Sequence, residues 1–527
     1  MTPRSDSNLR LLRSSAVVLL VTAAGFVADV AKDMVIAGSF GATALADAFF
    51  LSYTIPFAII ASLLSAGRSV FVPIFTGLLL QGGRGAVWSL ARSLILLGTA
   101  ALLLVSLLGV AVSPWLVRLI GVGLSSKAEA IASQMSQVMF LALVPAATVA
   151  VLGSVLLSLR RFAVFSALNL VRASGMLVLL ALLSRRLGIQ AAALGLLAGV
   201  LGQLLLVAYP SWRLGFSLMR RPQLVHVHVR HAIALLAWPL LSGLLLQNSR
   251  VIERGLATLL ASGSASAISY AYRIVFSVTT LLASSVVWVL LPTMSAHAAA
   301  GENRLLAERT SVGIKMMSLV IAPISIALLV CNRPIVQILF ERGAFDPSAT
   351  ALTAPALQWY ALGMLGISLL PVYNSAFYAL GRVRVPVSND VVLVLANVAL
   401  DVVLVRTLGL SGLALGYSLA GMLALGRIAI LFRRHVGDAT GHGLLVFGVR
   451  LAAASILMAC CVAFVYGVVS KSLLPASWLG QLLLLGLTLA LGVCVFYGSL
   501  MALRMPELST VLSTIRELLH RSGRRQG

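Results

Sequence analysis

Residues 38–75 read GSFGATALADAFFLSYTIPFAIIASLLSAGRSVFVPIF and combine a nearly continuous apolar run with two charges, Asp47 and Arg68, and two prolines, Pro56 and Pro73. About 20 apolar helical residues suffice to cross a hydrocarbon core about 30 Å thick. Charged residues inside such a run are costly and usually face a cavity or a partner. A proline within the run predicts a kinked or tilted helix. This stretch therefore predicts a membrane-spanning helix that lines a polar space.

The composition of the whole chain agrees with this interpretation. The 527 residues are 60% hydrophobic and only 10% charged, and the mean hydropathy is +1.04. A soluble protein carries about 25% charged residues. Outer-membrane barrels are excluded, because their strands alternate polar and apolar residues in short segments. The sequence therefore predicts an all-α polytopic membrane protein.

We expect about fourteen transmembrane helices. The first follows a basic N-terminal flank and leads directly into another span, so we interpret it as an uncleaved helix rather than a signal peptide. The expected spans lie near residues 13–37, 46–79, 88–112, 130–158, 163–184, 189–212, 232–258, 265–292, 312–332, 352–379, 385–406, 411–432, 445–470 and 476–503.

The net charge of +24 is best explained by basic residues in cytoplasmic loops rather than by binding of nucleic acid or anionic lipid. Arginines are concentrated in alternate loops and in the C-terminal tail, and the Arg185–Arg186 pair runs against this trend. The positive-inside rule then places both termini in the cytoplasm.

Two pairs of segments repeat at nearly one offset. Gly41 aligns with Gly263, 222 residues later, and Gly188 aligns with Gly409, 221 residues later. This offset covers six spans, an even number, so the two copies insert in the same orientation. Transporters built from such parallel halves bind substrate between the halves. We expect an N-lobe at 1–222, a C-lobe at 223–440, two extra helices at 441–505 and a basic cytoplasmic tail at 506–527.

Charges within the expected spans are the candidate functional residues, because intramembrane charges usually face a cavity or a partner. They are Asp29, Lys32, Asp33, Asp47, Arg68, Arg172, Arg250, Glu253, Arg254, Arg273, Asp390 and Asp401.

The spacing of two groups allows two interpretations. One helix face of span 1 carries Asp29, Lys32 and Asp33. One helix face of span 7 carries Arg250, Glu253 and Arg254. Each group is either neutralised internally or forms the wall of a cavity for a charged substrate.

Arg273 in span 8 has no carboxylate three or four residues away. We therefore expect it to need a partner from another helix or an anion, and a pair with Asp47 across the two halves would act as a gate. The arginine fork binds phosphate oxygens bidentately and keeps its charge when desolvated. A cavity with Lys32, Arg254 and Arg273 would favour a phosphate or pyrophosphate group.

Other kinds of site are not indicated. The chain has no Gly-Lys dipeptide, so no Walker A loop is present and transport is not driven by an ATPase of its own. His226 and His228 lie in a basic loop and are not expected to bind a metal. We expect no cofactor, no metal and no catalytic residues. The short expected loops also argue against a membrane-embedded enzyme.

Several motifs resemble the lipid II flippase (MurJ/MviN) family of the MOP exporter superfamily. The motifs are KDMVIAGSFGATALADAFFLSYTIPF (32–57), FVPIF (71–75), LASGSASAISYAYRIVF (260–276), LLPTMS (290–295), FERGAFD (340–346) and FYALGRVRVPV (377–387). The resemblance covers roughly residues 20 to 435.

This resemblance implies a V-shaped flippase with two six-helix lobes and a cationic central cavity. Its substrate would be an undecaprenyl-pyrophosphate-linked saccharide, moved from the inner to the outer leaflet. Lys32 stands where the family has an essential arginine, Asp33 follows it, and Asp47 and Arg273 match family positions. Together with the intramembrane charges, the expected substrate-binding and transport residues are Lys32, Asp33, Asp47, Arg68, Arg254 and Arg273, with Asp29, Arg250 and Glu253 in support. The expected partners are the lipid-linked saccharide, the bilayer and other proteins of cell-envelope synthesis.

The chain departs from the family pattern at two cations. Phe26 and Ile60 stand where the family has arginines, and Arg68 compensates only in part. The peptidoglycan precursor lipid II is thus one expected substrate, and an exopolysaccharide or O-antigen repeat unit is the other. A small-solute or multidrug antiporter, a membrane enzyme and a non-transporting scaffold are the remaining alternatives.

Overall fold

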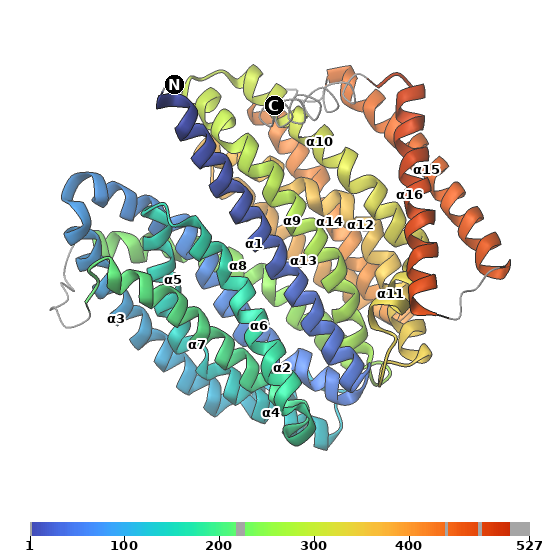
Figure 1. The fold of residues 1–527 in the computed structure, drawn as a ribbon, viewed down its shortest axis with the longest axis horizontal. Helices are drawn as coiled ribbons and strands as arrows, with labels where there is room; N and C mark the ends of the chain where they lie inside the picture. The colour runs from blue at the N-terminus through green and yellow to red at the C-terminus, as the bar shows by residue number, and fades with distance from the viewer. Residues whose placement is uncertain (1–2, 218–226, 438–440, 473–476, 506–527) are drawn as a thin grey trace. The chain divides into compact units, whose positions relative to one another are not determined.

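The computed structural model describes residues 3–217, 227–437, 441–472 and 477–505 (Figure 1). The expected amphipathic helix of the tail, residues 506–527, and the histidine His226 lie outside these ranges. Within them the chain is helical throughout, with short turns between helices and no strand. The expectation of an all-α chain is confirmed.

The first half of the chain contains eight α-helices and one π-helix among the described residues. They are α1 (Pro3–Phe40), α2 (Ala44–Ala66), η1 (Gly67–Phe71), α3 (Val72–Ile120), α4 (Ser126–Leu141), α5 (Leu143–Ser158), α6 (Phe162–Leu187), α7 (Gln190–Arg213) and α8 (Val227–Thr258).

The second half continues with eight further α-helices in the described ranges. They are α9 (Ser264–Ala299), α10 (Asn303–Val330), α11 (Asn332–Phe340), α12 (Pro347–Ala379), α13 (Arg384–Leu408), α14 (Leu410–His435), α15 (Gly441–Ser472) and α16 (Trp478–Ala502).

Twelve stretches of the described chain are long and apolar enough to cross a membrane. One of them, Ala44–Ile120, has 77 residues, far more than one crossing needs. It is broken at Gly83, whose φ of 66° and ψ of −168° are not helical. The two expected spans at 46–79 and 88–112 lie on either side of this break. The chain is therefore multi-pass, and the count of fourteen spans stays a prediction.

Span 2 does not end at its internal proline. α2 continues through Pro56, and the helical register changes further on, in the π-helix Gly67–Phe71. A π-helix places an extra residue in one turn, and such turns are frequent at functional sites. Arg68 lies in this turn and its side chain is exposed.

The chain divides into two compact units. One comprises residues 1–270 and 340–349, and the other comprises residues 271–339 and 350–527. The boundary therefore falls inside α9. α8 belongs to the first unit, where it packs on α2 and α3. These units do not coincide with the repeat boundary expected at residues 222 and 223, and the lobe assignment stays a prediction.

In the first unit the most extensive helix packing joins α6 with α7 and α1 with α6 (Figure 1). α3 packs against α5 around an apolar core that contains Phe75, Trp88 and Leu156. The indole N–H of Trp88 donates to the carbonyl of Leu214 at 3.2 Å, which ties the core to the end of α7.

In the second unit α13 pairs with α14, and α10 packs with α15 and α16. Gly363 of α12 approaches α14 so closely that a Cβ would lie 2.4 Å from the Cα of Ser418. α15 and α16 share an apolar core that includes Met458, Val462 and Phe496.

Two helix pairs of the chain are joined by glycine turns of the same backbone geometry. Gly188 links α6 to α7 with φ 59° and ψ −141°, and Gly409 links α13 to α14 with φ 57° and ψ −132°. Positive φ of this kind strongly favours glycine. The helix pairs α6–α7 and α13–α14 are thus joined by the same turn, and the repeat of the two lobes stays a prediction.

Glycine sets the spacing of α6 and α7. A Cβ on Gly199 would lie 2.6 Å from the carbonyl oxygen of Arg172, whereas a Cβ on Gly486 of α16 would meet no atom within 4 Å. We expect Gly199→Val to destabilise the fold by about 1–3 kcal/mol through overpacking and to lower the melting temperature in detergent. Gly486→Val is the matched control. Equal melting temperatures of the two variants would contradict this account of α6–α7 packing.

Candidate functional site

The polar site of the first unit begins on one face of α1. Asp29, Lys32 and Asp33 are all buried, and Lys32 and Asp33 have no solvent exposure. The Lys32 ammonium lies 2.6 Å from Asp33 Oδ1 and 3.9 Å from Asp29 Oδ1. The helical spacing thus produces the internal pairing that the sequence predicted as one of two alternatives.

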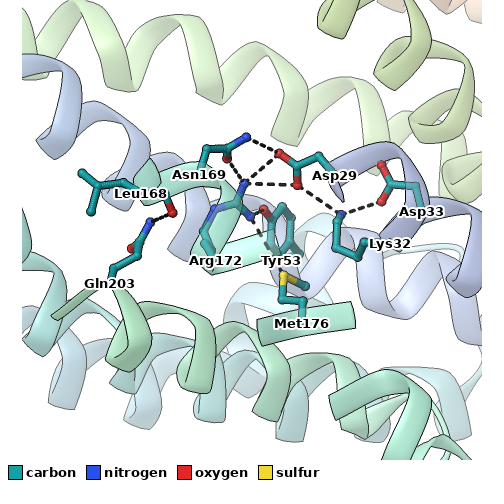
Figure 2. A network of polar contacts seen from close by, with 9 residues as sticks. All are labelled: Asp29, Lys32, Asp33, Tyr53, Leu168, Asn169, Arg172, Met176 and Gln203. Carbon is teal, nitrogen blue, oxygen red and sulfur yellow. Dashed lines mark hydrogen bonds and ion pairs between the residues drawn. The ribbon is translucent and has the colours of Figure 1, made fainter. Parts of the chain in front are cut away.

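A second cation enters this cluster from α6 (Figure 2). Arg172 is 3% exposed, and its Nη2 donates to Asp29 Oδ1 at 3.2 Å and to Asp29 Oδ2 at 3.0 Å. Its Nη1 donates to the Tyr53 hydroxyl of α2 at 3.1 Å. Asn169 bridges the pair, because its Nδ2 donates to Asp29 at 2.9 Å and its Oδ1 accepts from Arg172 at 2.5 Å.

Two aromatic rings flank these cations. The Arg172 guanidinium lies 5.0 Å from the centre of the Phe57 ring, and the Lys32 ammonium lies 5.8 Å from that of Tyr53. Tyr53 and Phe57 stack on each other with centroids 4.7 Å apart. A cation near an aromatic face gains about 2 kcal/mol or more when it is desolvated.

The cluster is formally neutral. The two cations, Lys32 and Arg172, balance the two carboxylates, Asp29 and Asp33. Neutrality explains how four ionisable side chains can be buried together in a membrane helix bundle, where an unpaired charge is costly.

Close helix contacts hold Arg172 in place. Its backbone packs on Gly199 of α7, and α1 approaches α6 at Gly25, where a Cβ would lie 3.2 Å from the Leu170 nitrogen. One turn before Arg172, Gln203 of α7 donates to the Leu168 carbonyl at 2.8 Å (Figure 2). The guanidinium is therefore supported through both its backbone and its side chain.

Asp47 has a separate role, because its carboxylate caps a second helix. The Gly263 N–H donates to Asp47 Oδ2 at 2.7 Å, and the Ser266 N–H donates to Oδ1 at 2.6 Å. These amides lie at the start of α9, and a carboxylate satisfies such free donors and complements the helix dipole. Backbone amides thus bind both oxygens of Asp47, a role that the sequence did not indicate, and the pair of Asp47 with Arg273 stays a prediction.

Three turns are packed backbone to backbone around this cap. A Cβ on Gly263 (φ 93°) would lie 2.1 Å from the Ala42 oxygen, and one on Gly41 (φ 66°) would lie 2.3 Å from the Ala344 oxygen. The Ala344 N–H donates to the Gly38 carbonyl at 2.8 Å. The end of α1, the start of α9 and the loop before α12 therefore form one tight junction within the first unit.

A comparable but exposed cap lies beside the junction. Asp346 Oδ1 accepts from the Ala349 N–H at 2.8 Å and from the Ser348 hydroxyl at 2.7 Å, at the start of α12. These hydrogen bonds hold the pKa of the Asp346 carboxyl below its usual range.

The span 7 charges divide between two roles. Arg250 Nη1 lies 2.5 Å from Glu253 Oε2, and both side chains are buried. Arg254 reaches α2, where it donates to the Thr54 hydroxyl and, at 3.3 Å, to the Phe50 carbonyl. The first pair is neutralised internally, and Arg254 fastens α8 to α2.

The structure thus groups the expected site residues unevenly. Lys32, Asp33 and Asp29 form one cluster, whereas Asp47 and Arg254 make separate contacts in the same unit. Arg273 lies in the part of α9 that belongs to the second unit, and its side chain is partly buried. The sequence marks Arg172 only as an intramembrane charge, since Asp29 lies 143 positions away from it.

The comparison with protein families decides which family this chain belongs to. Residues 36–486 match the family model described as "Lipid II flippase MurJ". This chain belongs to the lipid II flippase MurJ family. The resemblance noted in the sequence is confirmed, and the family is one of transporters.

Individual relatives agree with this MurJ assignment. The lipid II flippase MurJ of Burkholderia cenocepacia is 26% identical over 459 residues, which cover 84% of this chain and 88% of the relative. A solved structure of lipid II flippase MurJ in an inward closed conformation matches with a TM-score of 0.72 at 20% identity, covering 92% of this chain and 99% of that one. An inward-facing multidrug resistance MATE family transporter of the MOP superfamily matches with a TM-score of 0.67 at 15% identity, covering 79% and 95%. The structural likenesses confirm the fold class.

The Asp29–Arg172 pair can be tested by a double-mutant cycle. Removing one partner of a buried ion pair costs about 3–5 kcal/mol, because the other charge is left buried. We therefore expect Arg172→Met and Asp29→Asn each to lower the melting temperature in detergent. The double variant should lose clearly less than the two single losses combined. Strict additivity of the two losses would show that the pair is not coupled.

Proposed function

We propose that this MurJ family member is a flippase that moves an undecaprenyl-pyrophosphate-linked saccharide from the inner to the outer leaflet of the bacterial cytoplasmic membrane. The substrate we expect is the peptidoglycan precursor lipid II, because the relatives of this chain are named lipid II flippases. The observation that carries the proposal is the match of residues 36–486 to the lipid II flippase family. Both termini would lie in the cytoplasm, because basic residues are concentrated in the corresponding loops.

The α1–α6 cluster supplies the chemistry that such a substrate needs. Arg172 donates to both oxygens of Asp29 through one nitrogen, Nη2, and Lys32 presents an ammonium next to Asp33. A pyrophosphate offers oxygens of the same kind and can take the place of a carboxylate on either cation. Binding would therefore exchange internal ion pairs for pairs with the substrate.

The junction around Asp47 would close one side of the transport path. Its two hydrogen bonds to the start of α9 and the backbone contacts of Gly41 and Gly263 hold the ends of three segments together. In the proposed orientation this junction lies toward the outer face. Release of the substrate to the outer leaflet would require these contacts to break. Asp47 would therefore act as a gate.

A second substrate class is supported by one specific observation. By the sequence resemblance, Phe26 and Ile60 stand where the family has cations, and Ile60 is 1% exposed. A chain with fewer cations than its relatives suits a different lipid-linked glycan, such as an exopolysaccharide or O-antigen repeat unit. The small-solute antiporter rests on the MATE likeness, which extends to the fold alone, and none of the contacts described above favours it.

Complementation tests the substrate directly. We expect expression of this chain to rescue bacteria depleted of their own lipid II flippase. Lys32→Met and Arg273→Ala should abolish rescue, because each removes a cation proposed to face the pyrophosphate, and Asp47→Ala should abolish it by removing the gate. Lys32→Arg, which keeps the charge, and Asp346→Ala, which removes an exposed cap, are the matched controls and should still rescue.

The readout must separate transport from expression. Immunoblots of membrane fractions establish that each variant is present at the parental level. Failure of the parent chain to rescue despite full expression would refute lipid II as the substrate and leave the other lipid-linked glycans. Rescue by Lys32→Met would show that this cation is not part of the path.

A further inference from the structure

A groove on the surface of the second unit is not used by the site described above. It lies along α14, has a volume of about 730 Å³, and falls within the range of about 300–1,000 Å³ that is usual for ligand pockets. Its wall includes Leu400 of α13 and Leu419, Leu423 and Ile430 of α14. Arg434 lies at one end of the groove, and Arg427 lies two turns before it on α14. We propose that this groove binds one anionic phospholipid, with an acyl chain along the apolar wall and the phosphate at the two arginines.

The length of the groove fits one leaflet. From Leu419 to Arg434 the chain is a continuous helix of about 22 Å at a rise of about 1.5 Å per residue. Half of a bilayer, including its headgroup region, measures about 20–22 Å. A lipid whose phosphate lies at Arg434 would therefore reach the far end of the groove with its chain.

Hydrogen bonds orient Arg427 and leave some of its N–H donors available to a ligand in the groove. Its Nη1 donates to Asn389 Oδ1 at 3.1 Å and its Nη2 donates to Ser388 Oγ at 3.1 Å, both on α13. These partners are neutral, so they orient the guanidinium without compensating its charge. Two of its five N–H groups are used by these bonds, and none of the described residues that line the groove is a carboxylate.

Arg434 adds a second charge two turns further along the same face. It is exposed in the last turn of α14, beside Arg433 and His435. In the orientation proposed above this end of α14 faces the cytoplasm, where the leaflet is rich in anionic lipid. Basic pockets between membrane helices on that side are suited to anionic headgroups. The charge of the site is thus complementary to an anionic phospholipid rather than to a zwitterionic or neutral one.

Gly426 leaves the apolar part of the groove open. A Cβ at this position would meet no atom within 4 Å, and its backbone is helical. Gly426→Leu would therefore fill the groove without straining the helix. Leu423 and Ile430, on either side, are 58% and 56% exposed, so the wall is available to an acyl chain.

The test measures lipid retention by the full-length protein and needs no flippase activity. The purified chain is released from detergent micelles in a mass spectrometer after incubation with phosphatidylglycerol or phosphatidylcholine of the same acyl chains. We expect the parent to retain one phosphatidylglycerol at concentrations at which phosphatidylcholine is lost. Each of Arg427→Gln and Arg434→Gln should weaken retention about fivefold, which corresponds to about 1 kcal/mol per arginine.

Matched variants separate the site from general attraction. Arg185→Gln with Arg186→Gln removes two exposed charges from the end of α6 and should leave retention unchanged, as should Gly486→Leu on the open face of α16. Gly426→Leu should weaken retention of the long-chain lipid but not of soluble glycerophosphate. Circular dichroism confirms that each variant is folded.

Three results would overturn the proposal. The first is undiminished phosphatidylglycerol retention by the Arg427→Gln, Arg434→Gln double variant. The second is an equal loss in the Arg185→Gln, Arg186→Gln control, which would indicate non-specific attraction. The third is displacement of phosphatidylglycerol by a lower concentration of undecaprenyl pyrophosphate, which would make the groove a site for the transported lipid. None of these results bears on whether the chain flips lipid II, because retention and complementation are measured separately.

Discussion

The pairing of buried cations with buried carboxylates is the constraint on which the first unit depends. Lys32 has no exposure and Arg172 has 3%, and neither charge could remain in a helix bundle of this apolarity without a partner. Asp29 serves both cations, since it lies 3.9 Å from Lys32 and 3.0 Å from Arg172. One carboxylate therefore fixes the rotation of α1 relative to α6, and Tyr53 adds α2 to the same arrangement.

Glycine makes that arrangement geometrically possible. An ion pair between helices forms only when the helices approach closely, and Gly25 and Gly199 remove the side chains that would prevent this on either side of α6. Small residues play this part in many membrane helix interfaces, where packing and hydrogen bonds replace the hydrophobic effect as the driving force. The charged cluster can therefore be buried in the membrane only because the glycine contacts let the helices approach closely.

The sequence predicted what depends on spacing along one helix and missed what depends on contacts between helices. The Lys32 pairing with Asp29 and Asp33 follows from neighbouring positions on α1, and the Arg250–Glu253 pair follows in the same way. Helix pairs such as α6–α7 were placed within a few residues, because long apolar runs leave little choice. Tertiary partners carry no such signal, since Arg172 and Asp29 are 143 residues apart and Asp47 caps α9 from 216 residues away. A carboxylate that binds backbone amides needs no complementary side chain, so nothing in the sequence marks the partner of Asp47.

The neutrality of the cluster has a consequence for the proposed transport. A pyrophosphate that binds both Lys32 and Arg172 brings its own negative charge and would compete with Asp29 and Asp33 for these cations. Carboxylates that lose part of this pairing are costly to keep buried, so they would move toward water or take up protons. Either response disturbs the contact of α1 with α6, because Asp29 is what joins the two helices. A ligand shifts a conformational equilibrium only through its differential affinity for the two states. Competition for the same cations supplies such a difference, and it would couple the arrival of the substrate to the rearrangement that its translocation requires.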